Sequence, residues 1–132
     1  MENILVLAEH DNGQLKLATL SAISFARKVV TEAGGAFDIL AIGEAVGGVA
    51  EQLRNFGAAN VLAADHARLK HPLGDNYAYV VAEVAKQRGS TIVAGAASTF
   101  SKDILPCAAG LLDAGMLSDV VDVRRDGDDF VF

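Results

Sequence analysis

The sequence is poor in the residues that build several common kinds of site. Its 132 residues include one cysteine, three histidines, two prolines and no tryptophan. Cys107 is the single cysteine, so no intrachain disulfide can form, and we expect a reducing compartment, the cytoplasm. His66 and His71 are five residues apart, a spacing that does not place both on one helical face, and no second cysteine joins them. We therefore expect no metal site.

Long apolar runs and excess positive charge are also missing. No run approaches the length that spans a membrane, and no leader peptide precedes the first predicted strand at Ile4, so we expect a soluble protein without membrane insertion. The formal net charge of −6 argues against nucleic-acid binding, because the phosphates would repel the chain. Six aspartates and two arginines fall between Asp113 and Phe132, where they form either solvated turns or an acidic docking face.

Two nucleotide-binding motifs are absent. A dinucleotide fold would place a Gly-x-Gly-x-x-Gly turn after the first strand, but Glu9-His10-Asp11-Asn12-Gly13 stands there, with two acids where a phosphate would sit. No glycine-rich loop ends in Gly-Lys-Ser or Gly-Lys-Thr. A nicotinamide site and a P-loop are therefore not expected.

What the chain does have is an alternation of buried strands and amphipathic helices. The expected strands are residues 4–8, 37–42, 60–64, 91–94 and 117–123, and the expected helices are about 20–33, 48–56, 75–88 and 104–113. A turn at Asp126-Gly127-Asp128 leads into Phe130-Val131-Phe132 as a final hairpin. The pattern predicts one α/β domain over residues 1–132, with a mostly parallel sheet, helices on both faces and a C-terminal antiparallel edge hairpin.

The chain ends on Phe130-Val131-Phe132, in the middle of a predicted strand and without a polar tail. Buried apolar strands seldom end a natural chain in this way. We therefore expect residues 1–132 to be the front part of a longer protein.

The stretch after the strand at residues 91–94 is the best candidate for binding an anion. It is a loop of small and hydroxylated residues, and Asp103 is expected to cap a helix whose first turn contains Pro106. Loop amides, hydroxyls, a lysine and the positive end of the helix would converge there. The alternative is that the small residues serve packing and the hydroxyls only cap the loop. The candidate cofactor-binding residues are Gly95, Ser98, Ser101 and Lys102.

The sequence signals for other kinds of functional site are weaker. His10, between two acids, is either a proton donor or a surface turn residue, and no serine, histidine and acid set forms a nucleophile motif. We expect no catalytic residues. A phosphoacceptor receiver domain is a further alternative, because it needs acids after the first strand, an aspartate after the third and a hydroxyl after the fourth. Those positions are held by Glu9, Asp11, Asp65 and Ser98.

Several stretches together resemble the N-terminal domain of the electron transfer flavoprotein alpha subunit. The resemblance covers nearly the whole chain in the same order, which makes it specific although each piece alone is weak. The similar stretches are residues 4–15, Ala26-Arg27, residues 57–62, residues 95–106 and residues 117–121.

The resemblance implies a three-layer, Rossmann-like fold of the adenine nucleotide alpha hydrolase type. It implies an alpha subunit that pairs with an electron transfer flavoprotein beta subunit and carries electrons on FAD. The expected donors are acyl-CoA or related flavin dehydrogenases, as in fatty acid beta-oxidation, and the expected acceptor is a quinone oxidoreductase or another redox partner. FAD contacts would come mainly from a domain after Phe132, which this chain lacks.

Three hypotheses follow. The first is a scaffold and partner-docking domain of an electron carrier, which is not itself an enzyme. The second is a small module that binds AMP or ATP through the loop from Gly95 to Lys102. The third is the receiver domain.

Overall fold

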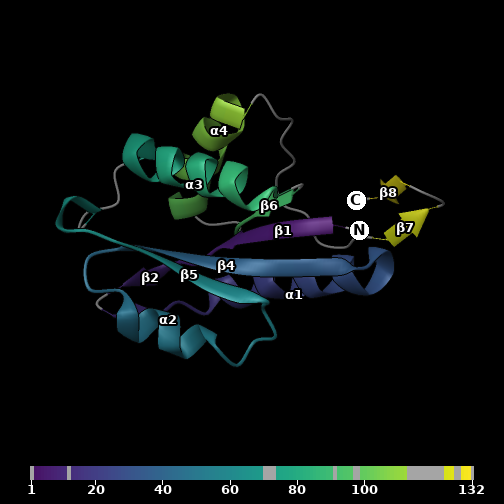
Figure 1. The fold of residues 1–132 in the computed structure, drawn as a ribbon, viewed down its shortest axis with the longest axis horizontal. Coiled ribbons are helices and arrows are strands. Elements are labelled where there is room, and N and C mark those ends of the chain that lie inside the picture. The colour runs from purple at the N-terminus through teal and green to yellow at the C-terminus, as the bar shows by residue number, and fades with distance from the viewer. Residues whose placement is uncertain are drawn as a thin grey trace.

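A four-stranded parallel sheet forms the centre of the molecule (Figure 1). The computed structural model describes residues 2–11, 13–69, 74–90, 92–96, 99–112, 124–126 and 129–131. The sheet contains β1 (Glu2–Leu7), β4 (Gly35–Gly43), β5 (Asn60–Asp65) and β6 (Ile92–Ala94), in the order β5-β4-β1-β6. In the middle of the sheet, Val6 pairs with Ile39 on one side and with Ala94 on the other.

The strand order excludes the receiver hypothesis. Receiver domains follow a doubly wound order in which the third strand along the chain lies beside the first. Here the third parallel strand, β5, pairs with β4, and the fourth, β6, pairs with β1. This arrangement follows the dinucleotide-fold order, in which the first strand lies between the second and the fourth.

The helices cover both faces of the sheet, as the sequence predicted. Helices α1 (Ala18–Ala33) and α2 (Gly47–Leu53) lie on one face, and α3 (Gly74–Arg88) and α4 (Thr99–Leu112) lie on the other, as Figure 1 shows. A short 3₁₀ turn, η1 (Ala67–Leu69), follows β5. The result is a three-layer α/β structure.

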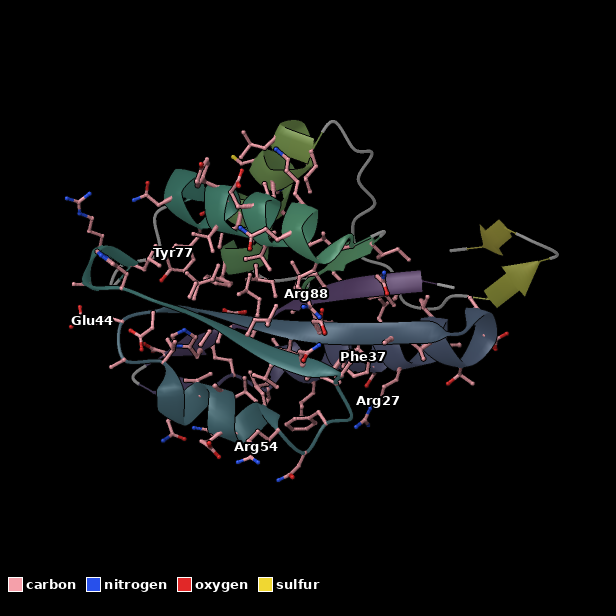
Figure 2. All side chains as sticks on the ribbon, viewed as in Figure 1. Arg27, Phe37, Glu44, Arg54, Tyr77 and Arg88 are labelled. Atoms are coloured by element: carbon pink, nitrogen blue, oxygen red, sulfur yellow. The ribbon has the colours of Figure 1, made fainter. Side chains whose placement is uncertain are left out.

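Two hydrophobic cores lie between the layers, one on each face of the sheet. Both faces receive side chains because these alternate along each strand. From β1, Ile4 and Val6 pack toward α1 and α2, whereas Leu5 and Leu7 pack toward α3 and α4. The side chains of β4 alternate in the same way. All four of these β1 residues are almost fully buried, as are their neighbours in the centre of β4. Figure 2 shows the side chains filling the space on either side of the sheet.

The start of α4 was predicted wrongly. The expected helix began at Ile104, with Asp103 as its cap and Pro106 in its first turn, but α4 begins at Thr99 and contains both residues in its interior. A proline there removes one helical hydrogen bond. Burial of Ile104 and Ala108 against α3 compensates for that loss, and tertiary packing thus overrides the local signal.

Two small antiparallel hairpins complete the fold. The C-terminal one joins β7 (Arg124–Asp126) to β8 (Asp129–Val131), which confirms the predicted hairpin. These two strands form a sheet of their own beside α1. The second hairpin, β2 (His10–Asp11) with β3 (Gln14–Leu15), was not predicted and follows β1 directly. The strand expected at 117–123 lies outside the described residues.

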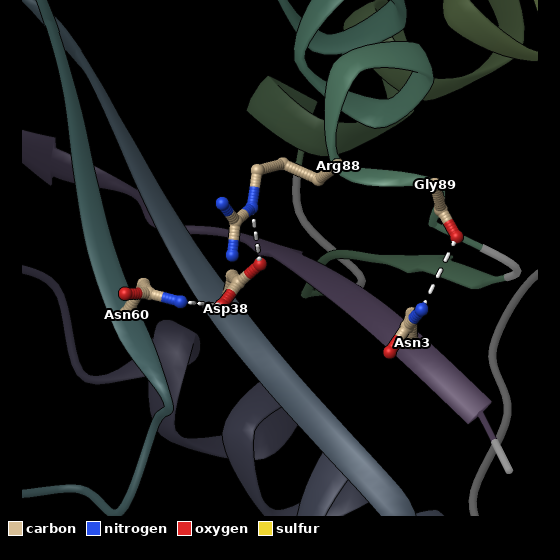
Figure 3. A network of polar contacts seen from close by, with 5 residues as sticks. All are labelled: Asn3, Asp38, Asn60, Arg88 and Gly89. Atoms are coloured by element: carbon tan, nitrogen blue, oxygen red, sulfur yellow. Dashed lines mark hydrogen bonds and ion pairs between the residues drawn. The ribbon is translucent and has the colours of Figure 1, made fainter.

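At the amino end of β5, a network of polar contacts links β4 and β5 to α3 (Figure 3). Asp38 of β4 accepts hydrogen bonds from Asn60 Nδ2 at Oδ1 and from Arg88 Nε at Oδ2, both at 3.1 Å. Arg88 is the last residue of α3. Beside it, Asn3 Nδ2 of β1 donates to the Gly89 carbonyl at 3.4 Å. The C-terminal end of α3 is therefore fixed over the sheet.

Candidate functional site at the carboxyl edge of the sheet

The strand order places a topological switch point between β1 and β6. From β1 the chain continues to β4 and β5 on one side, and it then crosses to β6 on the other. In open α/β sheets, ligands bind at the carboxyl ends of the strands that flank such a point. The residues that follow β1 and β6 are therefore the candidate site.

Just after β1, hydrogen bonds from Thr19 of α1 fix the backbone of Glu9. The Glu9 N–H donates to Thr19 Oγ1 at 2.8 Å, and the Thr19 hydroxyl donates to the Glu9 carbonyl at 3.1 Å. Thr19 is fully buried. Helix α1 begins one residue before Thr19, at Ala18, so the Thr19 hydroxyl does not cap the helix but bonds the end of the strand.

One carboxyl oxygen of Glu9 is buried and has no hydrogen-bond partner among the described residues. Glu9 is 9% exposed, and its Oε2 accepts no hydrogen bond within the described part of the chain. A buried polar group that makes no hydrogen bond is rare in folded proteins, and each case calls for an explanation. The carboxyl group of Glu9 is the outstanding polar feature of the switch point.

The hairpin of β2 and β3 occupies the place where a phosphate-binding loop would run. Its turn contains Gly13, whose φ of 76° favours glycine. Gln52 of α2 holds the hairpin from the side, because its Oε1 accepts from the Leu15 N–H at 3.1 Å and its Nε2 donates to the Gly13 carbonyl at 2.9 Å. The Lys16 N–H donates to the Glu9 carbonyl at 2.9 Å, so the hairpin returns to the end of β1.

His10 anchors the same hairpin to β4. Its Nε2 lies 2.7 Å from the Ile42 carbonyl oxygen, and because a carbonyl only accepts, Nε2 carries the hydrogen. The ring packs against Gly43, where an added Cβ would lie 3.1 Å from His10 Cε1 and 2.9 Å from Val46 Cγ1. His10 is therefore half-buried and holds structure at this position, which supports neither a proton donor nor a free surface residue.

Asp65, the receiver candidate for phosphorylation, holds a loop instead. Its Oδ1 accepts from the Ala45 N–H at 2.7 Å, and its Oδ2 accepts from the Val46 N–H at 3.2 Å. Ala45 has a φ of 56°, an uncommon conformation for a residue with a side chain. The two hydrogen bonds fix the loop between β4 and α2, at whose outer end Figure 2 places Glu44.

Tyr77 covers the carboxyl end of β4 from the other face. Its hydroxyl donates to the Leu69 carbonyl at 2.5 Å and lies 3.4 Å from the Ile42 carbonyl. Its ring meets Phe100 of α4 edge to face, with centroids 6.0 Å apart. Burial raises the pKa of the Tyr77 hydroxyl above its ordinary value of 10.0.

The predicted anion-binding residues lie across the loop and helix that follow β6. Gly95 comes directly after β6, whereas Ser101 and Lys102 belong to the first turn of α4. Ser98 lies outside the described residues, as do the side chains of Ser101 and Lys102. The backbone therefore brings three of the four residues to the switch point, and binding by them stays a prediction.

No metal-binding cluster is found among the described residues, where no three histidine, cysteine, aspartate or glutamate side chains come together suitably. His66 Nδ1 accepts from the Arg68 N–H at 3.0 Å, and His71 lies outside the described residues. Cys107 is exposed on α4. Within the described chain, no helix is both long and apolar enough to cross a bilayer.

Comparison with protein families decides which family these features belong to. The family model described as "Electron transfer flavoprotein domain" matches residues 4–132. The chain belongs to the electron transfer flavoprotein family. The resemblance of the sequence to the N-terminal domain of the alpha subunit is thereby confirmed.

Curated members of the electron transfer flavoprotein family agree with this assignment. The chain is 38% identical over 121 residues to electron transfer flavoprotein subunit alpha of Pseudomonas aeruginosa, which covers 91% of this chain and 37% of the relative. It is 33% identical over 131 residues to that of Bacillus subtilis, 99% of this chain and 40% of the relative. It is also 28% identical to the acryloyl-CoA reductase electron transfer subunit beta of Anaerotignum propionicum, over 98% of this chain and 35% of the relative. The chain thus spans about two fifths of these relatives' length.

The carboxyl end of β1 does not fit the flavin dinucleotide that the family name implies. A pyrophosphate there needs free backbone amides, a close glycine turn and no nearby negative charge. In this structure the Glu9 amide is already bonded to Thr19, the hairpin fills the turn, and the Glu9 carboxyl group lies buried beside it. The residues at the end of β1 in this chain therefore do not fit a flavin pyrophosphate.

Sequence reasoning missed two residues that shape this edge. Thr19 and Gln52 each bond backbone that is distant in sequence, ten residues away for Thr19 and 39 for the Gln52 contact with Gly13. Neither belongs to a local motif. The Asn12-Gly13 pair was a usable signal for the hairpin, because such pairs favour tight two-residue turns.

Proposed function

We propose that this chain is the N-terminal scaffold and partner-docking domain of an FAD-dependent electron transfer flavoprotein alpha subunit. Residues 1–132 act as one domain in the cytoplasm. They pair with a beta subunit and support a separate flavin-binding part, which holds FAD. The domain itself performs no chemical step.

The observation that carries this proposal is the closed carboxyl end of β1. There the Thr19 hydroxyl occupies the Glu9 amide, and Gln52 fixes a hairpin over the turn. A dinucleotide fold that has lost its phosphate site in this way retains a rigid sheet and two helical faces. Those are the properties of a platform on which a redox module rests.

The direction of electron flow is proposed from the names of relatives. One relative is named as an electron transfer subunit of acryloyl-CoA reductase, and others as electron transfer flavoprotein alpha subunits. We infer that the complete protein takes electrons from acyl-CoA or related flavin dehydrogenases. It passes them to a quinone oxidoreductase or another acceptor.

The test is assembly with the beta subunit of the same organism. The purified chain is mixed with that subunit, and the molar mass is followed by size-exclusion chromatography with light scattering. We expect a one-to-one complex, and we expect the chain alone to bind no stoichiometric flavin by visible absorbance. A chain that stays monomeric beside the beta subunit, or that is yellow when purified alone, contradicts the proposal.

A second candidate function is nucleotide binding by Gly95, Ser98, Ser101 and Lys102, because this loop follows β6 at the switch point. AMP at a hundredfold its dissociation constant would stabilise the chain by about 2.7 kcal/mol. The Lys102→Ala variant would lose that effect, whereas Lys28→Ala on α1 would keep it. If AMP leaves the unfolding temperature of the wild type unchanged, this candidate is rejected.

A further inference from the structure

The feature that the proposed function does not use is the carboxyl group of Glu9. It lies at the carboxyl end of β1, beside the switch point, and Oε2 accepts no hydrogen bond within the described residues. Its own backbone is fully bonded, through Thr19 and Lys16. The backbone N–H and carbonyl of Glu9 therefore have their hydrogen-bond partners. Among the described residues, the atom without one is Oε2 of the side chain.

We propose that Glu9 is a binding subsite for one cationic group, an alkylguanidinium or alkylammonium. Burying a carboxylate oxygen is costly unless that oxygen is paired or hydrogen-bonded, and Oε2 of Glu9 is buried. A cationic donor compensates that cost best, because it supplies both a charge and a charge-assisted hydrogen bond. The tip of a slender side chain needs the least space beside a residue that is only 9% exposed.

The surroundings favour a positive occupant over a phosphate. Asp11 in β2 and Glu44 after β4 are exposed acids at the same carboxyl edge, and they add negative potential to it. The nearest lysine or arginine in sequence is Lys16, which donates its backbone N–H to the Glu9 carbonyl while its side chain is exposed. Among the described residues, none of the ion pairs found involves Glu9.

Two sources supply such a group: a basic side chain of a bound protein chain, or a free small cation. The first source rests on the proposed function, because the beta subunit would bring the basic residue. The second source is independent of it. The two arms of the experiment separate them.

The first arm compares Glu9→Gln with Glu44→Gln, a matched change at an exposed acid of the same edge. The affinity of each variant for the beta subunit is measured by isothermal titration calorimetry. Loss of one charge-assisted hydrogen bond is expected to raise the Kd by about tenfold to a hundredfold for Glu9→Gln. Glu44→Gln is expected to change it less than threefold.

Thermal unfolding of the isolated chain distinguishes a binding role from a structural one. Glu9→Gln keeps the shape of the side chain and removes the acid whose Oε2 is buried without a partner among the described residues, so its unfolding temperature is expected to rise by a few degrees. A residue kept only for structure would show the opposite sign. Weaker binding together with higher stability identifies Glu9 as a subsite held ready for a partner.

The second arm uses agmatine, a small guanidinium compound, with sodium chloride at matched ionic strength as the control. If the free cation is the occupant, agmatine raises the unfolding temperature of the wild type and of Glu44→Gln but not of Glu9→Gln. If the wild type binds the beta subunit and Glu9→Gln binds it equally, the protein source is rejected while the proposed function stands. If the wild type does not bind it, the proposed function fails and agmatine alone decides. Equal responses of wild type and Glu9→Gln in both arms overturn the subsite.

Discussion

Two nearly buried acids at opposite ends of the same sheet are treated differently by the fold. Asp38, whose side chain is 14% exposed, has a partner for each oxygen, Asn60 for Oδ1 and Arg88 for Oδ2. Glu9, at the carboxyl end, has no partner for Oε2 among the described residues. Among the described residues, both oxygens of the amino-end acid are bonded into the architecture, whereas the carboxyl-end acid keeps one buried oxygen without a partner.

The difference places a group that lowers the stability of the fold at the carboxyl edge, namely the buried Oε2 of Glu9. Around Glu9 the backbone is bonded as thoroughly as at the amino end, by Thr19, Gln52 and His10. The edge is therefore not loosely built, and the unpartnered carboxyl group stands in a rigid frame. A buried polar atom without a partner calls for an explanation, and completion by a bound partner is the one that we propose for Glu9.

The strongest test of that rigid frame is Thr19→Val. Valine keeps the shape but leaves the buried Glu9 N–H without an acceptor, so we expect a loss of about 2–3 kcal/mol in the free energy of unfolding by urea. Thr31→Val is the matched control, because the Thr31 hydroxyl bonds the Arg27 carbonyl on the exposed side of α1. That variant should change stability by less than about 0.5 kcal/mol. Equal effects would mean that the end of β1 is not rigid.

A smaller effect is expected for Gly43→Ala at the same edge. The new methyl group would lie 2.9 Å from Val46 Cγ1, and Val46 is buried, so the change should cost about 2 kcal/mol by overpacking. Gly48→Ala in α2 meets nothing within 4 Å and should instead stabilise the chain by about 0.5–1 kcal/mol. Thermal or urea unfolding of both variants measures the contrast in sign. Two stabilised variants would show that this edge has room to relax.

The amino end should respond less strongly. Asp38→Ala removes the acceptor for Asn60 and Arg88, but both of those side chains reach solvent, so we expect a loss of about 1 kcal/mol that shrinks in high salt. Glu51→Ala breaks the exposed pair with Arg54 and should cost less than about 0.5 kcal/mol. A loss for Asp38→Ala above that of Thr19→Val would reverse the contrast between the two ends.

The fold could be predicted from the sequence wherever a buried strand shows its own pattern. Ile4 to Leu7 is continuously apolar because helices cover both faces, and that run marks the strand without further context. The start of α4 was predicted wrongly because it depends on tertiary context. Asp103 and Pro106 make a good local start signal, but packing of Ile104 and Ala108 favours a longer helix, and packing is not visible locally.

The sequence indicated where along the chain the candidate site lies, but not which side chain in it is buried without a partner among the described residues. The turn after β1 and the loop at Gly95 were both singled out, and the strand order brings them to the switch point. That Glu9 is buried without a partner depends on Thr19, ten residues away, and on the hairpin held by Gln52. Such contacts are set by the tertiary structure, so no motif in the sequence announces them.

A pH-dependent effect sharpens the comparison at Tyr77, whose neutral hydroxyl donates a hydrogen bond at the carboxyl edge. Because burial raises the pKa of the folded hydroxyl above 10.0, the unfolded chain releases this proton first as the pH rises. The stability that Tyr77 contributes is therefore complete below pH 10.0 and is lost as the pH climbs through the folded pKa. Tyr77→Phe should cost about 1 kcal/mol at neutral pH, because the Leu69 carbonyl loses its donor, and that difference should shrink above pH 10.0. Urea unfolding of both chains between pH 7 and 11 measures this, and a difference that stays constant to the highest pH would show that the hydroxyl titrates alike in the folded and unfolded chain.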